Sequence, residues 1–216
     1  MLSSYVITIQ SKQQSIDIAN RCISSAAKFG IKVEQFKAYT PDDYPDKILV
    51  QKGVNTKGFD EVYSRGDNCR AAFLSHFSLW EKCVSDNHKY LIFEHDALVE
   101  DNIPTTAPFN KVMTIGKPSY GKFNTPSSFG INPLTHKRYF GGAHAYMITP
   151  SGAHDLIRTA TEGKAKPTDV YLNLDLFPWL QEYYPWPVRA DDNFSTIQNK
   201  NGIIAKHNYS EGYKLI

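Results

Sequence analysis

The opening of the chain constrains its fold more than any other stretch. β-Branched and aromatic residues fill Tyr5–Ile9 and predict a first strand. Small and aliphatic residues then recur at helical spacing over Ser15–Phe29, and Gly30 marks the end of this predicted helix. The side chains of Ile31–Tyr39 alternate as in a second strand. A strand–helix–strand order predicts a parallel α/β sheet, because parallel neighbours need a crossover connection.

The middle of the chain predicts a helix, a strand and a long loop. The helix extends over about Cys69–Ser85, and Asp67 or Asn68 can cap its N-terminus. The apolar run Tyr90–Phe93 predicts a strand directly after it. Lys117–Lys137 is crowded with Gly, Pro, Ser and Asn and shows no periodicity. We expect a loop of that length to be functional or mobile.

The rest of the chain adds a strand, a helix and an aromatic tail. Gly141–Ile148 predicts a strand entered through glycines, and Ser151–Thr161 predicts a helix. The 216 residues are 41% hydrophobic and 21% charged, which is an ordinary globular composition. We therefore predict one α/β domain that spans residues 1–216.

Charge and cysteine usage narrow the possible functions. The net charge of +2 is no basis for nucleic-acid binding, because strongly basic binders show a clear excess of cations. The three cysteines have no paired spacing, which predicts reduced thiols in an intracellular protein. The first residues do not resemble a signal peptide, and no window approaches the roughly 18 apolar residues of a membrane span. We expect a soluble, cytoplasmic protein, with peripheral attachment to a membrane left open.

The predicted strand Tyr90–Phe93 ends abruptly in three ionisable residues, Glu94, His95 and Asp96. Carboxylates two residues apart on an extended chain point to the same side, and at that distance they raise each other's pKa. Ligands of open α/β sheets bind beyond the carboxyl ends of strands, and Mg²⁺ or Mn²⁺ takes carboxylates together with phosphate oxygens. The pattern suits a metal that carries a nucleoside diphosphate, and a solvated strand end explains the spacing equally well.

Three blocks in the same order resemble glycosyltransferase family 25, the lipopolysaccharide- and collagen-modifying sugar transferases. They are Ala71–Val99 (AAFLSHFSLWEKCVSDNHKYLIFEHDALV), Gly141–Ile157 and Pro167–Asn173, with a weaker echo in Asp191–Gln198. The resemblance implies a GT-A type fold: a Rossmann-like, mixed but mostly parallel sheet flanked by helices. It also implies a nucleotide-sugar half at about residues 1–100 and an acceptor half at about 101–216.

The resemblance assigns the metal ligands. The acid-x-acid element of the family corresponds to Glu94 and Asp96. Asp96 would hold the Mn²⁺ or Mg²⁺ that bridges the diphosphate, and Glu94 would support the metal or the nucleotide ribose. His95 replaces the second Asp of the family pattern, but its side chain should point to the other side of the strand. His207 is a candidate late metal ligand, with a surface histidine as the alternative.

The transfer chemistry calls for a base. The departing diphosphate needs a metal or cationic clamp, and the acceptor hydroxyl must lose a proton. The resemblance suggests inversion, which places a carboxylate base opposite the leaving group. Asp169 is the candidate, with a helix N-terminal carboxylate as the alternative. Asp191 and Asp192 compete for the role, although a polar turn explains them as well.

Other residues have candidate binding roles. Gly142 allows close backbone approach to a ligand, and His144 follows as a possible donor or acceptor contact. His76 is predicted to be a packed, hydrogen-bonded core histidine. The aromatic segment Phe177–Pro187 predicts either an acceptor platform or a lid on the C-terminal core, and we favour the lid.

These patterns together predict a metal-dependent, inverting glycosyltransferase. It would move a sugar from a nucleotide-sugar donor, with a UDP-sugar favoured, to a hydroxyl of a glycan or lipopolysaccharide-like saccharide. One alternative is a phage-type enzyme that acts on hydroxylated DNA bases, which should show a basic groove and salt-sensitive binding. Another is a non-catalytic nucleotide-sugar-binding module.

Overall fold

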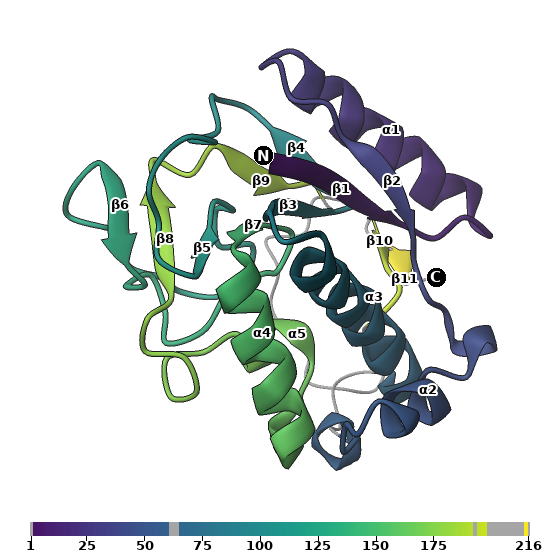
Figure 1. Cartoon of the computed structure of the whole chain (residues 1–216). Coiled ribbons are helices and arrows are strands. Elements are labelled where there is room, and N and C mark those ends of the chain that lie inside the picture. The colour runs from purple at the N-terminus through teal and green to yellow at the C-terminus, as the bar shows by residue number, and fades with distance from the viewer. Residues whose placement is uncertain (1, 61–64, 192–193, 198–213, 216) are drawn as a thin grey trace.

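The computed structural model describes residues 2–60, 65–191, 194–197 and 214–215 (Figure 1). Seven strands form one mixed sheet in the order β2-β1-β3-β7-β5-β8-β6. Their bounds are β1 Leu2–Thr8, β2 Glu34–Lys37, β3 Lys89–Glu94, β5 Val112–Thr114, β6 Gly130–Pro133, β7 Ala145–Ile148 and β8 Gln181–Tyr184. Two small sheets pair β4 (Ala97–Val99) with β9 (Val188–Ala190), and β10 (Phe194–Ser195) with β11 (Lys214–Leu215).

The predicted strand–helix–strand opening is confirmed. Strand β1 pairs in parallel with both β2 and β3. The crossover from β1 to β2 contains helix α1 (Gln13–Ala27). Beyond β3 the sheet becomes mixed, because β7 is antiparallel to β3 and β5 while β8 is parallel to β5. The fold is therefore the expected α/β class with a mixed sheet.

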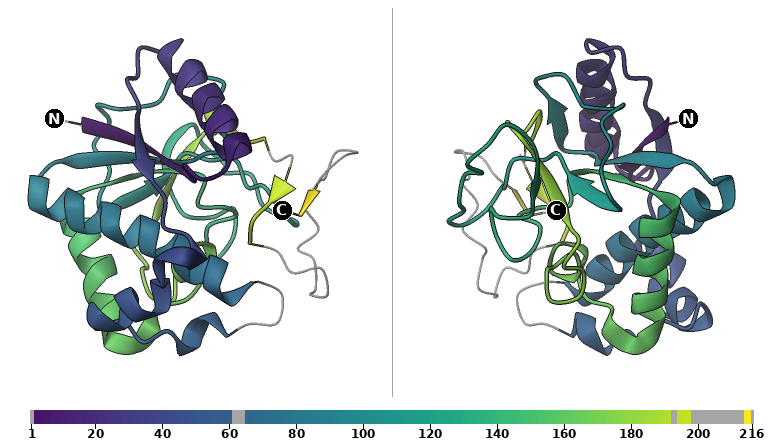
Figure 2. Two further views of the ribbon diagram at one scale, coloured as in Figure 1. Left: turned by 90° about the vertical axis from the view of Figure 1, so that its right-hand side faces the viewer. Right: turned by 60° about the vertical axis from the view of Figure 1, so that its left-hand side comes forward.

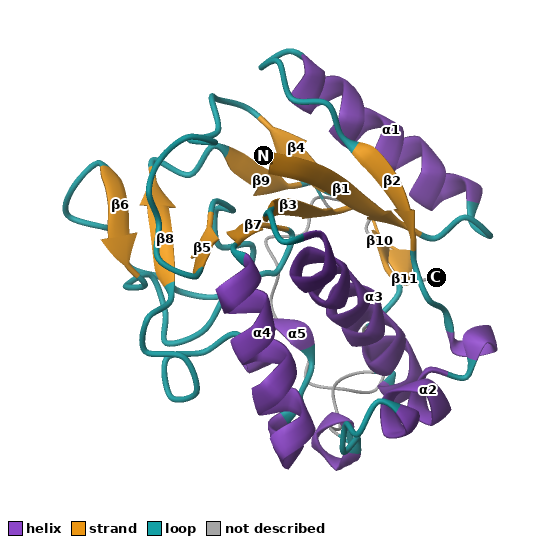
Figure 3. Cartoon of the chain, in the orientation of Figure 1, coloured by secondary structure: helices purple, strands orange, loops and turns teal. Residues whose placement is uncertain are grey.

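Helices cover both faces of the sheet (Figures 2 and 3). Helix α1 lies on one face, and α3 (Gly66–Asp86) and α4 (Pro150–Thr159) lie on the other. The remaining helices are α2 Pro45–Gln51, α5 Thr168–Tyr171, the 3₁₀ turns Pro41–Asp43 and Lys57–Phe59, and the π-helical turn Ala160–Lys164. Strand β3 separates two hydrophobic cores, because Tyr90 and Ile92 belong to the α3 side and Leu91 and Phe93 to the α1 side.

Helix α3 differs from its prediction at the N-terminus. It begins at Gly66 with Arg65 as the N-cap residue, and no side chain caps it. Asp67 and Asn68 lie within the first turn, where the Asn68 side chain donates to the Thr196 carbonyl at 2.7 Å. The predicted capping role is therefore wrong, because a tertiary contact engages the amide of Asn68 and Asp67 already has helical backbone geometry.

The loop predicted over residues 117–137 contains strand β6, which pairs antiparallel with β8. Its Gly and Pro residues hid this short strand from periodicity. The two glycines of the later strand prediction lie before β7, which begins only at Ala145. Gly142 has a φ of +124°, a conformation that L side chains rarely adopt.

The structure describes the three cysteines and bears on possible membrane spans. Cys22, Cys69 and Cys83 are buried and form no disulfide with one another. Across the described ranges, no helix is both long enough and apolar enough to cross a bilayer.

Candidate functional site

The acidic tip lies at the carboxyl end of β3, in the interior of the sheet. Glu94 closes the strand, and His95 and Asp96 form a turn that leads into β4. The expected extended geometry of the acid-x-acid element does not hold, because the chain turns between the two carboxylates. Glu94 hydrogen-bonds His76 of α3, whereas burial and, to a lesser degree, the charge of Asp96 raise the pKa of the Cys22 thiol of α1. The two carboxylates therefore interact with different helices.

His95 is directed toward the N-terminal part of α1. Its Nδ1 lies 2.7 Å from the Ser15 hydroxyl, which in turn accepts the Ile9 backbone N–H at 2.9 Å. Since Glu94 contacts α3, the expected separation of Glu94 and His95 onto opposite faces of the sheet is confirmed. His95 therefore links the turn after β3 to α1.

A chain of hydrogen bonds positions the Glu94 carboxylate. Trp80 Nε1–H donates to the Tyr146 hydroxyl at 2.8 Å, and Tyr146 lies 2.9 Å from His76 Nδ1. His76 Nε2 lies 3.1 Å from Glu94 Oε1. Because indole N–H is only a donor, the tyrosine proton is available to His76 Nδ1, which leaves the Nε2–H to donate to Glu94.

Glu94 is ionised in this environment. Burial alone would raise the pKa of its carboxyl, but the His76 hydrogen bond and the nearby His144 and His95 hold that pKa below its usual value. The Glu94 side chain is nevertheless 31% exposed. His76 itself is buried and hydrogen-bonded, as predicted, but the sequence did not reveal that its partner is the acidic tip.

Asp169 lies in the first turn of α5 and faces the same region. Its Oδ1 accepts the Ala143 backbone N–H at 2.9 Å, so it binds the loop before β7. Burial raises the pKa of Tyr120 well above its usual value, and the charges of Asp169 and Glu94 raise it further. Asp169 and Glu94 are linked by geometry through the same loop, because the Ala143 N–H donates to Asp169 and the neighbouring His144 carbonyl accepts the Glu94 N–H.

The loop that binds Asp169 also holds His144. The His144 carbonyl accepts the Glu94 backbone N–H at 2.9 Å, and its side chain is only 1% exposed. A Cβ added at Gly142 would lie 2.6 Å from His144 Nδ1, and one at Gly116 would overlap the other side of the ring. These glycines therefore make room for a buried imidazole of the protein itself. Ligand contact by Gly142 and His144 stays a prediction.

Lys137 and Tyr120 are site residues that the sequence analysis missed. The Lys137 ammonium lies 4.4 Å from the Tyr120 ring centroid and 5.4 Å from that of Tyr139, and it donates to the Tyr120 carbonyl. Burial lowers the pKa of Lys137, while the Asp169 charge acts in the opposite direction. Both residues lie in the Gly- and Pro-rich segment, where no periodic signal marks them.

The remaining site candidates are Asp191, Asp192 and His207. Asp191 forms ion pairs with Arg21 at 2.5 Å and Arg189 at 2.8 Å, so it links α1 to β9. Asp192 and His207 lie outside the described residues. Within the described parts of the chain, no group of three or more His, Cys, Asp or Glu side chains is placed to hold a metal ion.

The aromatic tail has two separate roles. Phe177 is 2% exposed and packs edge-on against Tyr171 at 5.3 Å between ring centroids, as the favoured core lid requires. Tyr184 and Trp186 instead belong to a different aromatic group near β6. The segment therefore covers the C-terminal core at Phe177 and reaches the protein surface at Tyr184 and Trp186.

In open α/β sheets ligands bind beyond the carboxyl ends of the strands, which is where Glu94 and Asp96 lie. The sequence comparison shows which family of proteins this is. Residues 1–111 match the model of glycosyltransferase family 25 (LPS biosynthesis protein). The match covers more than half of the chain, so the chain belongs to glycosyltransferase family 25. It is a glycosyltransferase, with a nucleotide-sugar donor and a saccharide acceptor.

The comparisons with solved structures and with curated proteins give a weak similarity and no match, respectively. A solved structure similar to this chain is that of mouse xyloside xylosyltransferase 1 in its apo form, at 11% identity and a TM-score of 0.34. The alignment covers 83% of this chain and 70% of that chain, and a similarity this low supports no inference about function. No curated protein matches the sequence.

Proposed function

We propose that this protein is a metal-dependent, inverting glycosyltransferase of GT-A type that uses a UDP-sugar. The acceptor is a hydroxyl of a glycan or of a lipopolysaccharide-like saccharide. One observation carries the proposal: the loop before β7 links Glu94 at the end of β3 to Asp169 at the start of α5, because its Ala143 N–H donates to Asp169 and its His144 carbonyl accepts the Glu94 N–H. Donor activation and deprotonation of the acceptor need two such carboxylates near one reaction centre.

The donor side of the proposal assigns Mn²⁺ or Mg²⁺ to Glu94 and Asp96. These cations bind through one or two carboxylates plus substrate phosphates, so the lack of a three-residue cluster among the described residues is compatible with them. The lowered pKa of Glu94 keeps the carboxylate in the form that binds a cation. When bound, the metal supplies positive charge to the departing diphosphate. His76 fixes the orientation of Glu94 by holding Oε1.

The acceptor side assigns the base to Asp169. The Ala143 N–H holds one carboxylate oxygen, which orients the group without neutralising it. The charges of Lys137 and Asp169 also interact, which places a cation near the candidate base. In this proposal the acceptor hydroxyl approaches Asp169 and loses its proton to it as the new glycosidic bond forms.

A thermal-shift screen of nucleotide sugars, with and without Mn²⁺, tests the donor side. We expect a UDP-sugar to raise the unfolding temperature only in the presence of Mn²⁺, because a ligand that binds the folded state stabilises it. Asp96→Asn should abolish that increase without lowering the unfolding temperature of the free protein. A shift that is equal without metal, or full activity of Asp96→Asn, would contradict the metal assignment.

The anomeric configuration of the product tests the stereochemistry. Inversion predicts that an α-linked donor yields a β-linked product, which NMR coupling constants of the purified product report. A product with the donor's configuration would rule out direct displacement assisted by Asp169. Binding of the donor without any transfer or hydrolysis would instead favour the non-catalytic module.

A further inference from the structure

An aromatic surface lies at the outer edge of the main sheet. Phe129, in the turn before β6, is 80% exposed. Its ring stacks on Tyr184 with 5.9 Å between centroids and 24° between planes. Tyr184 contacts Trp186 at 5.0 Å, and Trp186 contacts Phe123 at 5.7 Å. We call Phe123, Phe129, Tyr184 and Trp186 the aromatic platform.

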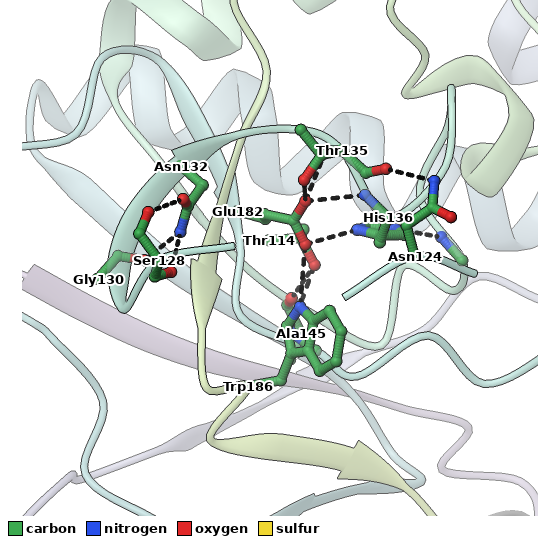
Figure 4. A network of polar contacts seen from close by, with 12 residues as sticks. Thr114, Asn124, Ser128, Gly130, Asn132, Thr135, His136, Ala145, Glu182 and Trp186 are labelled. Atoms are coloured by element: carbon green, nitrogen blue, oxygen red, sulfur yellow. Dashed lines mark hydrogen bonds and ion pairs between the residues drawn. The ribbon is translucent and has the colours of Figure 1, made fainter. Parts of the chain in front are cut away.

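The turn that carries Phe129 is firmly held although the ring is exposed. The Asn132 side chain accepts the Ser128 hydroxyl at 2.7 Å and donates to the carbonyls of Ser128 and Gly130 at 2.9 and 3.0 Å (Figure 4). Gly130 has a φ of +91°, which suits glycine. An ordered turn therefore holds a large apolar ring in water, next to other aromatic rings, and contiguous apolar surface of this kind marks ligand or interaction sites.

A buried polar network holds the other end of the aromatic platform. Trp186 Nε1–H donates to Glu182 Oε2 at 3.1 Å, and Glu182 is fully buried (Figure 4). The same carboxylate oxygen lies 2.9 Å from His136 Nδ1. The indole is therefore fixed by its polar edge, which leaves its apolar face to contact its neighbours in the platform.

The aromatic platform lies at the same end of the sheet as the candidate site. Tyr184 pairs with Gly130 at the end of β8, and β8 runs parallel to β5. Past its end, β5 leads to Gly116 beside the His144 ring. His136, which shares Glu182 with Trp186, also accepts the Gly141 N–H at 3.2 Å. The network under the platform is thus continuous with the loop that binds Asp169.

The size of this surface indicates what covers it. A stable protein interface buries about 800 Å² on each partner, whereas Phe129 is the one exposed member of the platform and Phe123, Tyr184 and Trp186 are half-buried. Tyr44 and Val50, the other exposed large hydrophobic residues in the described parts of the chain, lie near and in α2, away from β6 (Figure 1). A pyranose ring, in contrast, presents one apolar C–H face of about the area of an aromatic ring. Aromatic walls with a few fixed polar groups suit such ligands.

We propose that the aromatic platform binds the acceptor saccharide, stacking on sugar rings next to the one whose hydroxyl reacts. This proposal rests on the proposed function, because it extends the acceptor side of the same site. It assigns the platform to acceptor affinity and leaves the reaction itself to the residues around Asp169.

An array of soluble oligosaccharides, including lipopolysaccharide core oligosaccharides, tests the proposal with the full chain. We expect the wild type to bind at least one oligosaccharide and Phe129→Ala to bind it about tenfold more weakly, as when one ring is removed from a stack. Phe129→Trp, which keeps an aromatic ring at this position, should bind the oligosaccharide like the wild type. Tyr44→Ala, which removes an aromatic residue 74% exposed elsewhere, is the matched control and should bind like the wild type. The KM of the bound oligosaccharide as acceptor should rise in Phe129→Ala.

Other outcomes would contradict the assignment of the aromatic platform to saccharide binding. Equal binding by wild type and Phe129→Ala, or no binding to any oligosaccharide, would reject it. Phe129-dependent binding to phosphatidylglycerol vesicles, without glycan binding, would assign the surface to membranes. Phe129-dependent self-association in sedimentation would assign it to a second copy of the chain. If the wild type neither transfers nor hydrolyses any nucleotide sugar, the proposed function fails, while a Phe129-dependent glycan signal would still support saccharide binding.

Discussion

At the scale of single residues, Glu94 shows how a partly buried charge is stabilised. A buried carboxylate is unfavourable unless donors satisfy it. His76 provides one donor, and Tyr146 holds His76 in the tautomer that can donate. The acid is therefore oriented by side chains from α3 and β7, as well as by the strand that carries it.

Replacing Glu94 by Gln keeps the shape of the side chain and removes its charge. We expect the Mn²⁺-dependent kcat/KM to fall about 100-fold or more, because the cation loses a ligand and the diphosphate loses its clamp. Glu162→Gln is the control, since Glu162 is exposed in the turn after α4. Steady-state kinetics over a Mn²⁺ titration measures the effect. Unchanged metal dependence in Glu94→Gln would show that the cation binds elsewhere.

Asp169→Asn tests the base separately from the donor site. The amide can still accept the Ala143 N–H but cannot take a proton, so kcat should fall about 100- to 10,000-fold. The Mn²⁺-dependent thermal shift with donor should persist. Asp175→Asn is the control, because the Asp175 side chain is 71% exposed and lies shortly after α5. This variant should keep its activity. A normal kcat in Asp169→Asn would remove it from the reaction.

At the scale of elements, the β6–β8 pair depends on one buried carboxylate. Glu182 accepts from the backbone and hydroxyl of Thr135, from His136 and from Trp186. Burial alone would raise its pKa, but the His136 and Thr135 hydrogen bonds hold the pKa below the ordinary value of 4.5. The ionised form thus stabilises this edge of the sheet, on which the aromatic platform lies.

Glu182→Gln should lower the free energy of unfolding at pH 7 by about 3 kcal/mol, because it breaks a buried, charge-assisted network. The folded pKa lies below the unfolded one, so the Glu182 contribution is present above about pH 4.5 and is lost as pH falls through the folded value. Urea unfolding between pH 3 and 7 measures it. The variant should lose less stability than the wild type on acidification; an equal loss would contradict the role.

At the scale of the whole molecule, β3 lies between two cores. Leu91 packs on the α1 side and Ile92 on the α3 side, and both are fully buried. The predicted single domain requires these two cores to unfold together. The same strand ends in Glu94, so the rigidity of both cores supports the position of the site.

Leu91→Ala and Ile92→Ala should each lower the free energy of unfolding by about 3 kcal/mol, since each leaves a cavity in a close-packed core. Urea unfolding followed by tryptophan fluorescence and by circular dichroism should show one coincident transition for each variant. Exposed Val50→Ala is the control and should change stability by less than about 0.5 kcal/mol. Two separate transitions would show that the chain contains more than one folding unit.

The sequence by itself determined the elements with strong local periodicity and one chemical feature. Strand β1, helix α1 and strand β3 follow from residue spacing, and the family blocks indicate sugar transfer. The acids at the end of β3 were visible because an apolar run stopped at charged residues. Short elements such as β6 were missed, because four residues with Gly and Pro carry no period.

Only the tertiary structure decided which distant residues meet. His76 contacts Glu94 from another element, and the loop before β7 binds both Glu94 and Asp169. Such contacts depend on helix packing and strand order, which local spacing does not encode. The turn at Asp96 likewise replaced the extended geometry expected of an acid-x-acid element. Burial and long-range hydrogen bonding therefore determined the arrangement of the site, whereas the local sequence determined only which residues are available to form it.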